Sequence, residues 1–319
     1  MPTTKQSLLQ ALQQGEGAFC SGQALADTLG VSRAAVHKAA AVLQAQGWQI
    51  EAISRKGYRL MGQCDVFCAE GLGEYPYPTH IFDNLPSTNK HAKQLAIEGA
   101  PHGTLVLAAA QTAGRGRLGR GFYSPANSGI YMTLLLRPAL QAVDALPLTT
   151  AAAVAVCRAV EEKCGISLAI KWVNDLYYKD KKVCGILSEA ATDFETGTID
   201  WVAVGIGLNL TTTAFDETLA PIATSLYPDG SAPISRAALA GEIARQLLAL
   251  APDYNAMPAY QARCFTPGHW VTVHAAQETY PAKAIAIDES GRLIVERENG
   301  QRTALAQGEV SVRPAGIDY

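Results

Sequence analysis

The chain has 319 residues, 48% of them hydrophobic and 17% charged, which gives enough apolar surface for a sizeable core and excludes a disordered chain. The formal net charge of −3 is unevenly spread, because residues 1–62 carry six basic and three acidic side chains (+3), leaving −6 on the remainder. The length predicts two or three domains, and the basic N-terminal part predicts an anionic partner.

Several further classes are excluded by the residue pattern. The longest mostly apolar stretch, 145–157, is shorter than the roughly 20 residues that a membrane span needs. The N-terminal residues lead into no apolar signal-peptide core. The seven cysteines and six histidines show no metal-ligand spacing. We therefore expect a cytoplasmic protein with reduced thiols, no membrane contact and no tightly held structural metal.

Residues 1–62 predict a winged helix-turn-helix domain. Two short helical segments follow each other between 21 and 46. Ser21 and Ser32 are suited to cap their N-termini, and Gly30 can take the left-handed conformation that ends the first helix. A close helix crossing needs a small residue, a glycine in the turn and an apolar residue, supplied by Ala26, Gly30 and Val36.

A basic turn, Ser54–Gly57, lies between two alternating segments that predict the strands of a wing. The second helix is then placed to enter a major groove, with basic side chains on phosphates. The candidate DNA-binding residues are Gln23, Ser32, Arg33, His37, Lys38, Arg55 and Lys56. The structural alternative is an ordinary helical hairpin within a larger core.

The remaining chain predicts two more domains, which makes the whole an α+β protein. Residues 63–265, beginning with a linker at 63–78, mix both hydrophobic periods and predict a mixed α/β domain. Its strands are expected at 81–82, 104–109, 130–136, 169–173, 183–190 and 201–210, and its helices at 87–97, 148–164 and 235–250. Residues 266–319 predict a small β-barrel, with strands at 270–274, 282–287, 293–296, 303–305 and 310–313.

A glycine- and arginine-rich loop is the outstanding motif. Four glycines and three arginines fall within 114–121, and no acidic residue occurs between Glu98 and Asp144. Its glycines match G-x-G-x-x-G, but that fingerprint must open a helix, and turn residues follow here. Glycines let a ligand approach the backbone, and arginines clamp carboxylate or phosphate, so the loop predicts an anion site. The alternative is a flexible basic surface loop.

Two lysine-bearing segments, Lys171–Asp175 and Lys182–Glu189, lie at strand ends. A lysine alone is usually a solvated charge. Together with the arginine loop, the two segments predict a site for a molecule that bears several negative charges.

Five segments in chain order resemble the signature of the biotin protein ligases: Ser87–Asn89, Gly114–Arg120, Lys171–Asp175, Lys182–Leu187 and Gly205–Asn209. With its helix-turn-helix, the whole chain is similar to the bifunctional bacterial members, which are both ligase and biotin operon repressor. The resemblance implies a class II synthetase-like central domain and an SH3-like C-terminal barrel. Two positions depart from the family pattern. Val173 stands where the family usually has Pro, and Phe122 is the aromatic residue at a position that is often Trp.

The resemblance also implies roles for individual residues. The biotin-binding residues it implies are Ser87, Thr88, Asn89, Gln111, Arg115, Gly116, Arg117 and Lys182. The ATP-binding residues it implies are Arg117, Phe122, Lys171, Asn174, Asp175 and Asn209, with Asp175 on the Mg²⁺ side. Arg115, Arg117 and Lys182 would act in catalysis as electrostatic stabilisers.

The implied reaction has two steps. The biotin carboxylate attacks the α-phosphate of ATP and releases pyrophosphate, and a lysine amine of an acceptor protein then attacks the biotinyl-5′-adenylate. The implied partners are the biotin carboxyl carrier protein of acetyl-CoA carboxylase, operator DNA of biotin synthesis genes, and a second copy of the chain in a ligand-promoted homodimer. Two alternatives are a ligand-sensing repressor with little or no ligase activity, and a lipoate ligase on a related fold.

Overall fold

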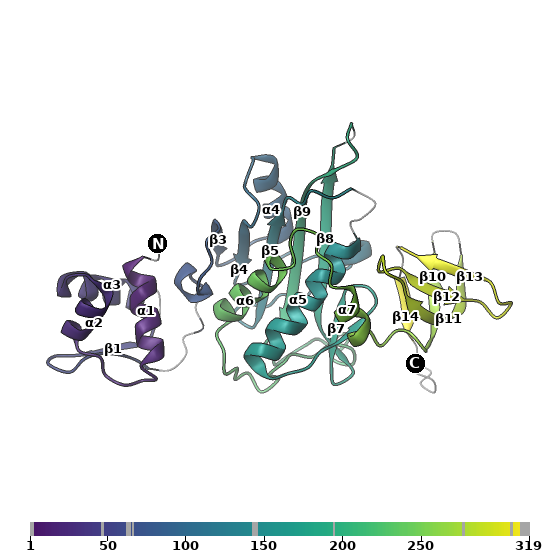
Figure 1. The fold of residues 1–319 in the computed structure, drawn as a ribbon. Coiled ribbons are helices and arrows are strands. Elements are labelled where there is room, and N and C mark those ends of the chain that lie inside the picture. The colour runs from purple at the N-terminus through teal and green to yellow at the C-terminus, as the bar shows by residue number, and fades with distance from the viewer. Residues whose placement is uncertain are drawn as a thin grey trace.

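The structure is a computed structural model that describes residues 3–45, 48–61, 65, 67–141, 146–193, 195–275, 278–306 and 309–312. Three units follow one another along the chain (Figure 1). The expected end of the second head helix at 46–47, the last residue of the expected head domain (62), part of the expected linker (63, 64 and 66) and Arg313 lie outside the described residues.

The N-terminal unit is a three-helix head with a wing, which confirms the predicted winged helix-turn-helix. Its elements are α1 (Thr4–Gln14), α2 (Gly22–Leu29), α3 (Arg33–Ala45), β1 (Ile50–Ile53) and β2 (Gly57–Leu60). The hydroxyl of Ser21 accepts from the Ala24 amide at 3.0 Å, and that of Ser32 accepts from the Ala35 amide at 3.1 Å. Gly30 ends α2 in the left-handed region, at φ 63°. The predicted caps therefore set the turn between α2 and α3.

The central unit is built on one seven-stranded sheet with the order β3-β4-β5-β9-β8-β7-β6. Only β3 and β4 pair in parallel. The strands are β3 (Thr79–Phe82), β4 (Leu105–Ala108), β5 (Gly129–Leu136), β6 (Ala169–Lys171), β7 (Asp175–Tyr178), β8 (Lys181–Thr192) and β9 (Ile199–Asn209). The helices are α4 (Thr88–Ile97), α5 (Leu146–Cys164), α6 (Arg236–Leu248) and α7 (Met257–Arg263), with short 3-10 turns η1 (Ala69–Leu72) and η2 (Arg117–Gly119).

Alternating side chains of the sheet enter two separate cores. On β5, Leu134 packs in the large core with α5 and α6, whereas its neighbour Leu135 packs in a smaller core with Ala92 of α4. Successive strand residues point to opposite faces, so α4 covers one face and α5 with α6 covers the other (Figure 1).

The strands and helices lie close to their predicted positions, with two exceptions. The expected strand at 169–173 ends at Lys171, and a turn leads directly into β7, which was not predicted. The peptide bond between Trp172 and Val173 in this turn is cis. Helix α7 was also missed, because its seven residues are too short for a clear helical period.

The C-terminal unit is a five-stranded antiparallel sheet with the order β13-β12-β11-β10-β14. Its strands are β10 (Trp270–His274), β11 (Thr279–Ile287), β12 (Leu293–Glu296), β13 (Arg302–Leu305) and β14 (Glu309–Val312). The side chains on its apolar face pack into the large core of the central unit. The Trp172 indole of the central unit also donates to the Gly291 carbonyl of this sheet unit at 2.9 Å. Within the described part of the chain, no helix combines the length and apolar character that crossing a membrane requires.

Candidate functional site

The glycine- and arginine-rich loop folds back on itself above the central sheet. The Gly116 amide donates to the Arg120 carbonyl at 2.7 Å, and the Phe122 amide donates to the Gly114 carbonyl at 2.9 Å. Leu118 at its tip takes φ 55° and is 72% exposed. Within this described stretch the loop forms a narrow hairpin, and no α-helix begins at its glycines. This confirms that the glycine pattern is not a dinucleotide-binding fingerprint.

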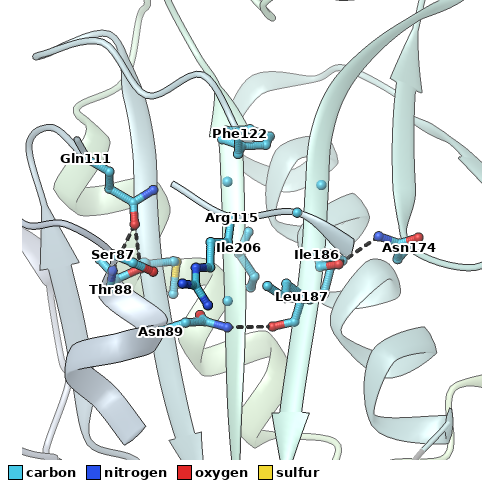
Figure 2. Close-up of a pocket in the computed structure, with 15 residues that line it drawn as sticks. Ser87, Thr88, Asn89, Gln111, Arg115, Phe122, Asn174, Ile186, Leu187 and Ile206 are labelled. Atoms are coloured by element: carbon cyan, nitrogen blue, oxygen red, sulfur yellow. Dashed lines mark hydrogen bonds between the residues drawn. The ribbon is translucent and has the colours of Figure 1, made fainter. Parts of the chain in front are cut away.

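Beneath the loop lies a first cavity, between α4, the loop and strands β8 and β9 (Figure 2). Its lining residues include six of the eight predicted biotin-binding residues: Ser87, Thr88, Asn89, Gln111, Arg115 and Gly116. Leu187 supplies an apolar side chain, whereas Met132, Ile186 and Ile206 line the cavity from strands on which their side chains pack in the large core on the opposite face of the sheet. The cavity therefore combines hydrogen-bonding groups at one end, one positive charge from Arg115 and an apolar side chain, which suits a compact ring that has polar edges.

Hydrogen bonds hold the polar end of this first cavity in place. The Thr88 amide donates to Gln111 Oε1 at 2.9 Å, and Gln111 Nε2 donates to Ser124 Oγ at 3.0 Å. Asn89 Nδ2 donates to the Leu187 carbonyl at 3.0 Å (Figure 2). Ser87 occupies the N-cap position of α4, but its side chain makes no capping bond. The site residues are thus fixed by one another.

Glycines open the floor of the first cavity. A Cβ at Gly205 would lie 2.0 Å from Asn89 Oδ1, and a Cβ at Gly207 would lie 2.5 Å from the Phe122 ring. Such contacts are impossible without displacement, so both glycines of the Gly205–Asn209 segment are needed for the site residues to occupy their positions.

A second cavity adjoins the first, and several of the side chains that line it are positively charged. Its lining includes every predicted ATP-binding residue: Arg117, Phe122, Lys171, Asn174, Asp175 and Asn209. Arg120 and Lys182 line it as well. Lys182 Nζ lies 2.7 Å from a carboxylate oxygen of Asp175, and Arg117 donates to Asn174 Oδ1 at 3.2 Å. The structure places Arg117 and Lys182 here, and not among the residues that line the first cavity.

The two cavities share one wall, made by Gly116, Phe122 and Asn174. The Asn174 amide group donates to the Ile186 carbonyl at 2.8 Å, and the Ile186 amide donates to the Asn174 carbonyl at 3.0 Å. Asn174 is therefore held firmly on β8, although Val173 precedes it where the family pattern has Pro. A molecule in one cavity would meet a molecule in the other at this wall.

The second cavity offers oxygen donors of the kind that Mg²⁺ prefers. Asp175 supplies a carboxylate, and Asn209 Oδ1 is buried without a hydrogen-bond partner. Mg²⁺ is commonly bound by one or two such protein groups together with substrate phosphates, so this donor set fits a nucleotide-bound Mg²⁺. Among the residues that the structure describes, no cluster of three or more metal-ligating side chains occurs.

Sequence reasoning gave no individual role to the residues that stand behind the first cavity. Thr133, Glu189 and Lys93 form hydrogen bonds that reach Thr88 and Asn89. One signal was present, because Thr133 is the one short polar side chain within the buried strand from Ile130 to Leu136. It also missed the apolar rim of the second cavity, formed by Tyr123, Phe215, Leu219 and Ile222.

A separate groove in the head gathers part of the predicted DNA-binding set. Gln23, Arg33, His37 and Arg55 line it together with Ser21, Ala34, Ser54 and Tyr58. Of the other predicted residues, Ser32 caps α3, Lys38 is exposed on α3, and Lys56 lies 5.9 Å from the centre of the Phe19 ring. The groove therefore runs between the N-terminus of α2, helix α3 and the wing.

Comparisons with known proteins match all three units. Residues 81–209 match the Biotin/lipoate A/B protein ligase family, residues 4–59 an HTH domain, and residues 270–313 the Biotin protein ligase C terminal domain. The chain is 35% identical to the Bifunctional ligase/repressor BirA of Bacillus subtilis, covering 93% of this chain and 95% of that protein. It is 34% identical to a Biotin--[acetyl-CoA-carboxylase] ligase of Mycobacterium tuberculosis, over 70% and 85% of the two chains.

The fold is similar to that of a solved Aquifex aeolicus biotin protein ligase in complex with biotin and ATP. The TM-score is 0.62 at 26% identity, covering 75% of this chain and 99% of that one.

Proposed function

Since this chain belongs to the biotin protein ligase family, as its match to a bifunctional ligase/repressor along nearly its whole length shows, we propose that it is an ATP-dependent biotin protein ligase and a DNA-binding repressor. The observation that carries the ligase assignment is the shared wall of the two cavities. A cavity suited to biotin and a more strongly cationic cavity suited to ATP meet at Gly116, Phe122 and Asn174.

The first step joins two anions, so the site must offset their repulsion. The biotin carboxylate oxygen attacks the α-phosphorus of ATP, the bond from that phosphorus to the bridging oxygen breaks, and pyrophosphate leaves. Arg115 in the loop and Arg117 and Lys182 at the second cavity supply fixed positive charge where negative charge gathers. They act by position and charge, not as proton carriers.

Mg²⁺, when bound with the nucleotide, supplies further charge neutralisation on its phosphates. Asp175 and Asn209 are the residues of this chain that would hold it. Lys182 pairs with Asp175 and thereby orients the carboxylate within the cavity.

In the second step the neutral amine of an acceptor lysine attacks the biotinyl carbonyl, the bond from that carbon to the phosphate oxygen breaks, and AMP and the amine proton leave. The acceptor is a biotin-dependent carboxyl carrier domain, and the biotin carboxyl carrier protein of acetyl-CoA carboxylase is the specific partner that we propose. Support comes from the mycobacterial relative, whose name states an acetyl-CoA-carboxylase substrate.

The head supplies the repressor function. Arg33 and His37 on α3 and Arg55 on the wing face one groove, as expected for a helix in a major groove beside a wing on the backbone. One head reads a short half-site, so tight binding needs a two-fold partner. We propose that the adenylate promotes a homodimer that binds the operator of biotin synthesis genes.

The direct test is incubation with ATP, Mg²⁺, biotin and a biotin carrier domain, followed by intact-mass measurement. The expected result is a carrier heavier by one biotinyl group. Lipoate in place of biotin should give no transfer. An unmodified carrier with tight biotin binding would instead indicate a ligand-sensing repressor, and lipoyl transfer would indicate a lipoate ligase.

A further inference from the structure

A chain of side chains runs from the edge of α4 to the wall of the first cavity. Lys93 Nζ donates to Glu189 Oε1 at 2.6 Å, and Asn89 Nδ2 donates to Glu189 Oε2 at 2.9 Å. At its other end, Asn89 Oδ1 lies 2.7 Å from Thr133 Oγ1, which lies 2.8 Å from Thr88 Oγ1. Thr88 and Asn89 line the cavity, whereas the other three stand behind it.

Because some of these groups can only donate and others can only accept, the donor and the acceptor of each hydrogen bond can be assigned. Burial alone would raise the pKa of Glu189, but hydrogen bonds from Lys93 and Asn89 outweigh it and hold the pKa below its usual value. The carboxylate is therefore ionised and can only accept. Asn89 must turn its NH₂ group toward Glu189 and the Leu187 carbonyl, and its oxygen toward Thr133.

A hydroxyl group has one proton to donate. Thr133 donates its proton to the Asn89 oxygen, which has none of its own. The 2.8 Å contact between the two hydroxyls then takes the Thr88 proton, in preference to Gln111 Oε1, which is a more distant acceptor 3.2 Å from Thr88 Oγ1. Thr88 Oγ1 is left with lone pairs, and without a free proton, toward a molecule in the cavity.

We propose that Glu189, held by Lys93, is a positioning residue that makes the Thr88 hydroxyl a hydrogen-bond acceptor for a ureido N–H group of biotin. The inference rests on the proposed function, because it assumes that biotin occupies the first cavity. It also assigns a source of specificity, since the dithiolane ring of lipoate has no N–H group to donate. A site built around a hydrogen bond rejects analogues that lack the matching group.

The test begins with Glu189→Gln. The Lys93 ammonium only donates, so the new amide must turn its oxygen toward Lys93 and its NH₂ group toward Asn89. Asn89 then has to turn as well, and it loses its bond to the Leu187 carbonyl. Thr133 now donates to Thr88, and the Thr88 proton turns toward Gln111 Oε1 or the ligand. We expect the Kd for biotin, measured by calorimetry without ATP, to rise about 10-fold to 100-fold.

The double variant Lys93→Met/Glu189→Gln separates this role from a merely structural one. Without the ammonium, the amide introduced at position 189 can turn its oxygen toward Asn89 and restore every direction in the chain. We expect the Kd of the double variant to return to within about threefold of the wild-type value, an energy well under that of one lost hydrogen bond. Glu161→Gln, which removes an ion pair with Arg263 on the surface, is the control and should leave the Kd unchanged.

A wild-type Kd in the single variant, or no recovery in the double variant, would overturn the inference while the proposed function stands. A wild-type protein that neither binds biotin nor transfers it would overturn both.

Discussion

Phe122 lies against two glycines of the sheet, and this contact yields a graded prediction. A Cβ at Gly207 on β9 would lie 2.5, 2.7 and 2.9 Å from three atoms of the Phe122 ring. A Cβ at Gly185 on β8 would lie 3.4 Å from the ring, which is close to ordinary contact. Gly207→Ala must therefore displace the ring, whereas Gly185→Ala requires little movement.

The displaced ring is part of the wall between the two cavities, so the loss should appear in adenylate formation. Overpacking of this kind typically costs about 1–3 kcal/mol, which corresponds to a fall of about 5-fold to 150-fold in kcat/KM for Gly207→Ala. For Gly185→Ala we expect a loss below about fivefold, since the nearest atom is the flexible end of Lys182.

The assay is pyrophosphate release in the presence of biotin and ATP, with a thermal melt to confirm that each variant is folded. The decisive comparison is made in a Phe122→Ala background, where no ring is present to be displaced. There Gly207→Ala should add little further loss. Full activity of Gly207→Ala, or the same loss factor with and without the ring, would refute the reasoning.

Three further predictions follow from charged groups. Lys182→Ala should lower adenylate formation about 10-fold to 100-fold in a folded protein, because a charge-assisted contact is lost. The neighbouring change Lys181→Ala should leave adenylate formation unchanged, and equal activity of the two variants would contradict the placing of Lys182 in the site. Asp65→Ala leaves the Arg236 guanidinium, 3% exposed, without its carboxylate; since Asp65 is itself 44% exposed, we expect a loss of about 1–2 kcal/mol, seen as a lower urea midpoint. Burial lowers the pKa of His91 from 6.5, so the unfolded chain binds the His91 proton at a higher pH than the folded chain does. The free energy of unfolding should therefore fall as the pH drops below 6.5. His91→Gln should flatten this part of the plot of stability against pH, and an unchanged slope would exclude His91 as its source.

Local signals in the sequence predicted most of the secondary structure. Ser21, Gly30 and Ser32 have side chains or backbone freedom that act within a few residues, so their roles could be assigned before the fold was known. Strand β7 could not be predicted in this way. It is four residues long, carries an acidic residue at its start, and is stabilised by pairing with β6 and β8.

The candidate site was predictable to the extent that its residues occur in compact motifs. What the sequence alone could not supply was the pairing between motifs. Glu189 meets Lys93 from a position 96 residues away, because β8 and α4 come together only in the folded domain. The separation of Arg117 and Lys182 from the first cavity has the same origin. The resemblance placed both beside biotin, and Arg117 beside ATP as well, and only the tertiary structure shows which cavity they line.

The head is fixed to the central unit, and this contact bears on how one chain can serve two functions. Lys5 of α1 lies 2.6 Å from a carboxylate oxygen of Glu70 in η1, whose side chain is only 7% exposed. Arg245 of α6 donates to the Leu72 carbonyl at 2.7 Å, which ties η1 to the central unit. Helix α3 therefore holds a set position relative to the central sheet (Figure 1). In a two-fold dimer joined through the central units, that position would set the distance between the two recognition helices and hence the half-site spacing of the operator.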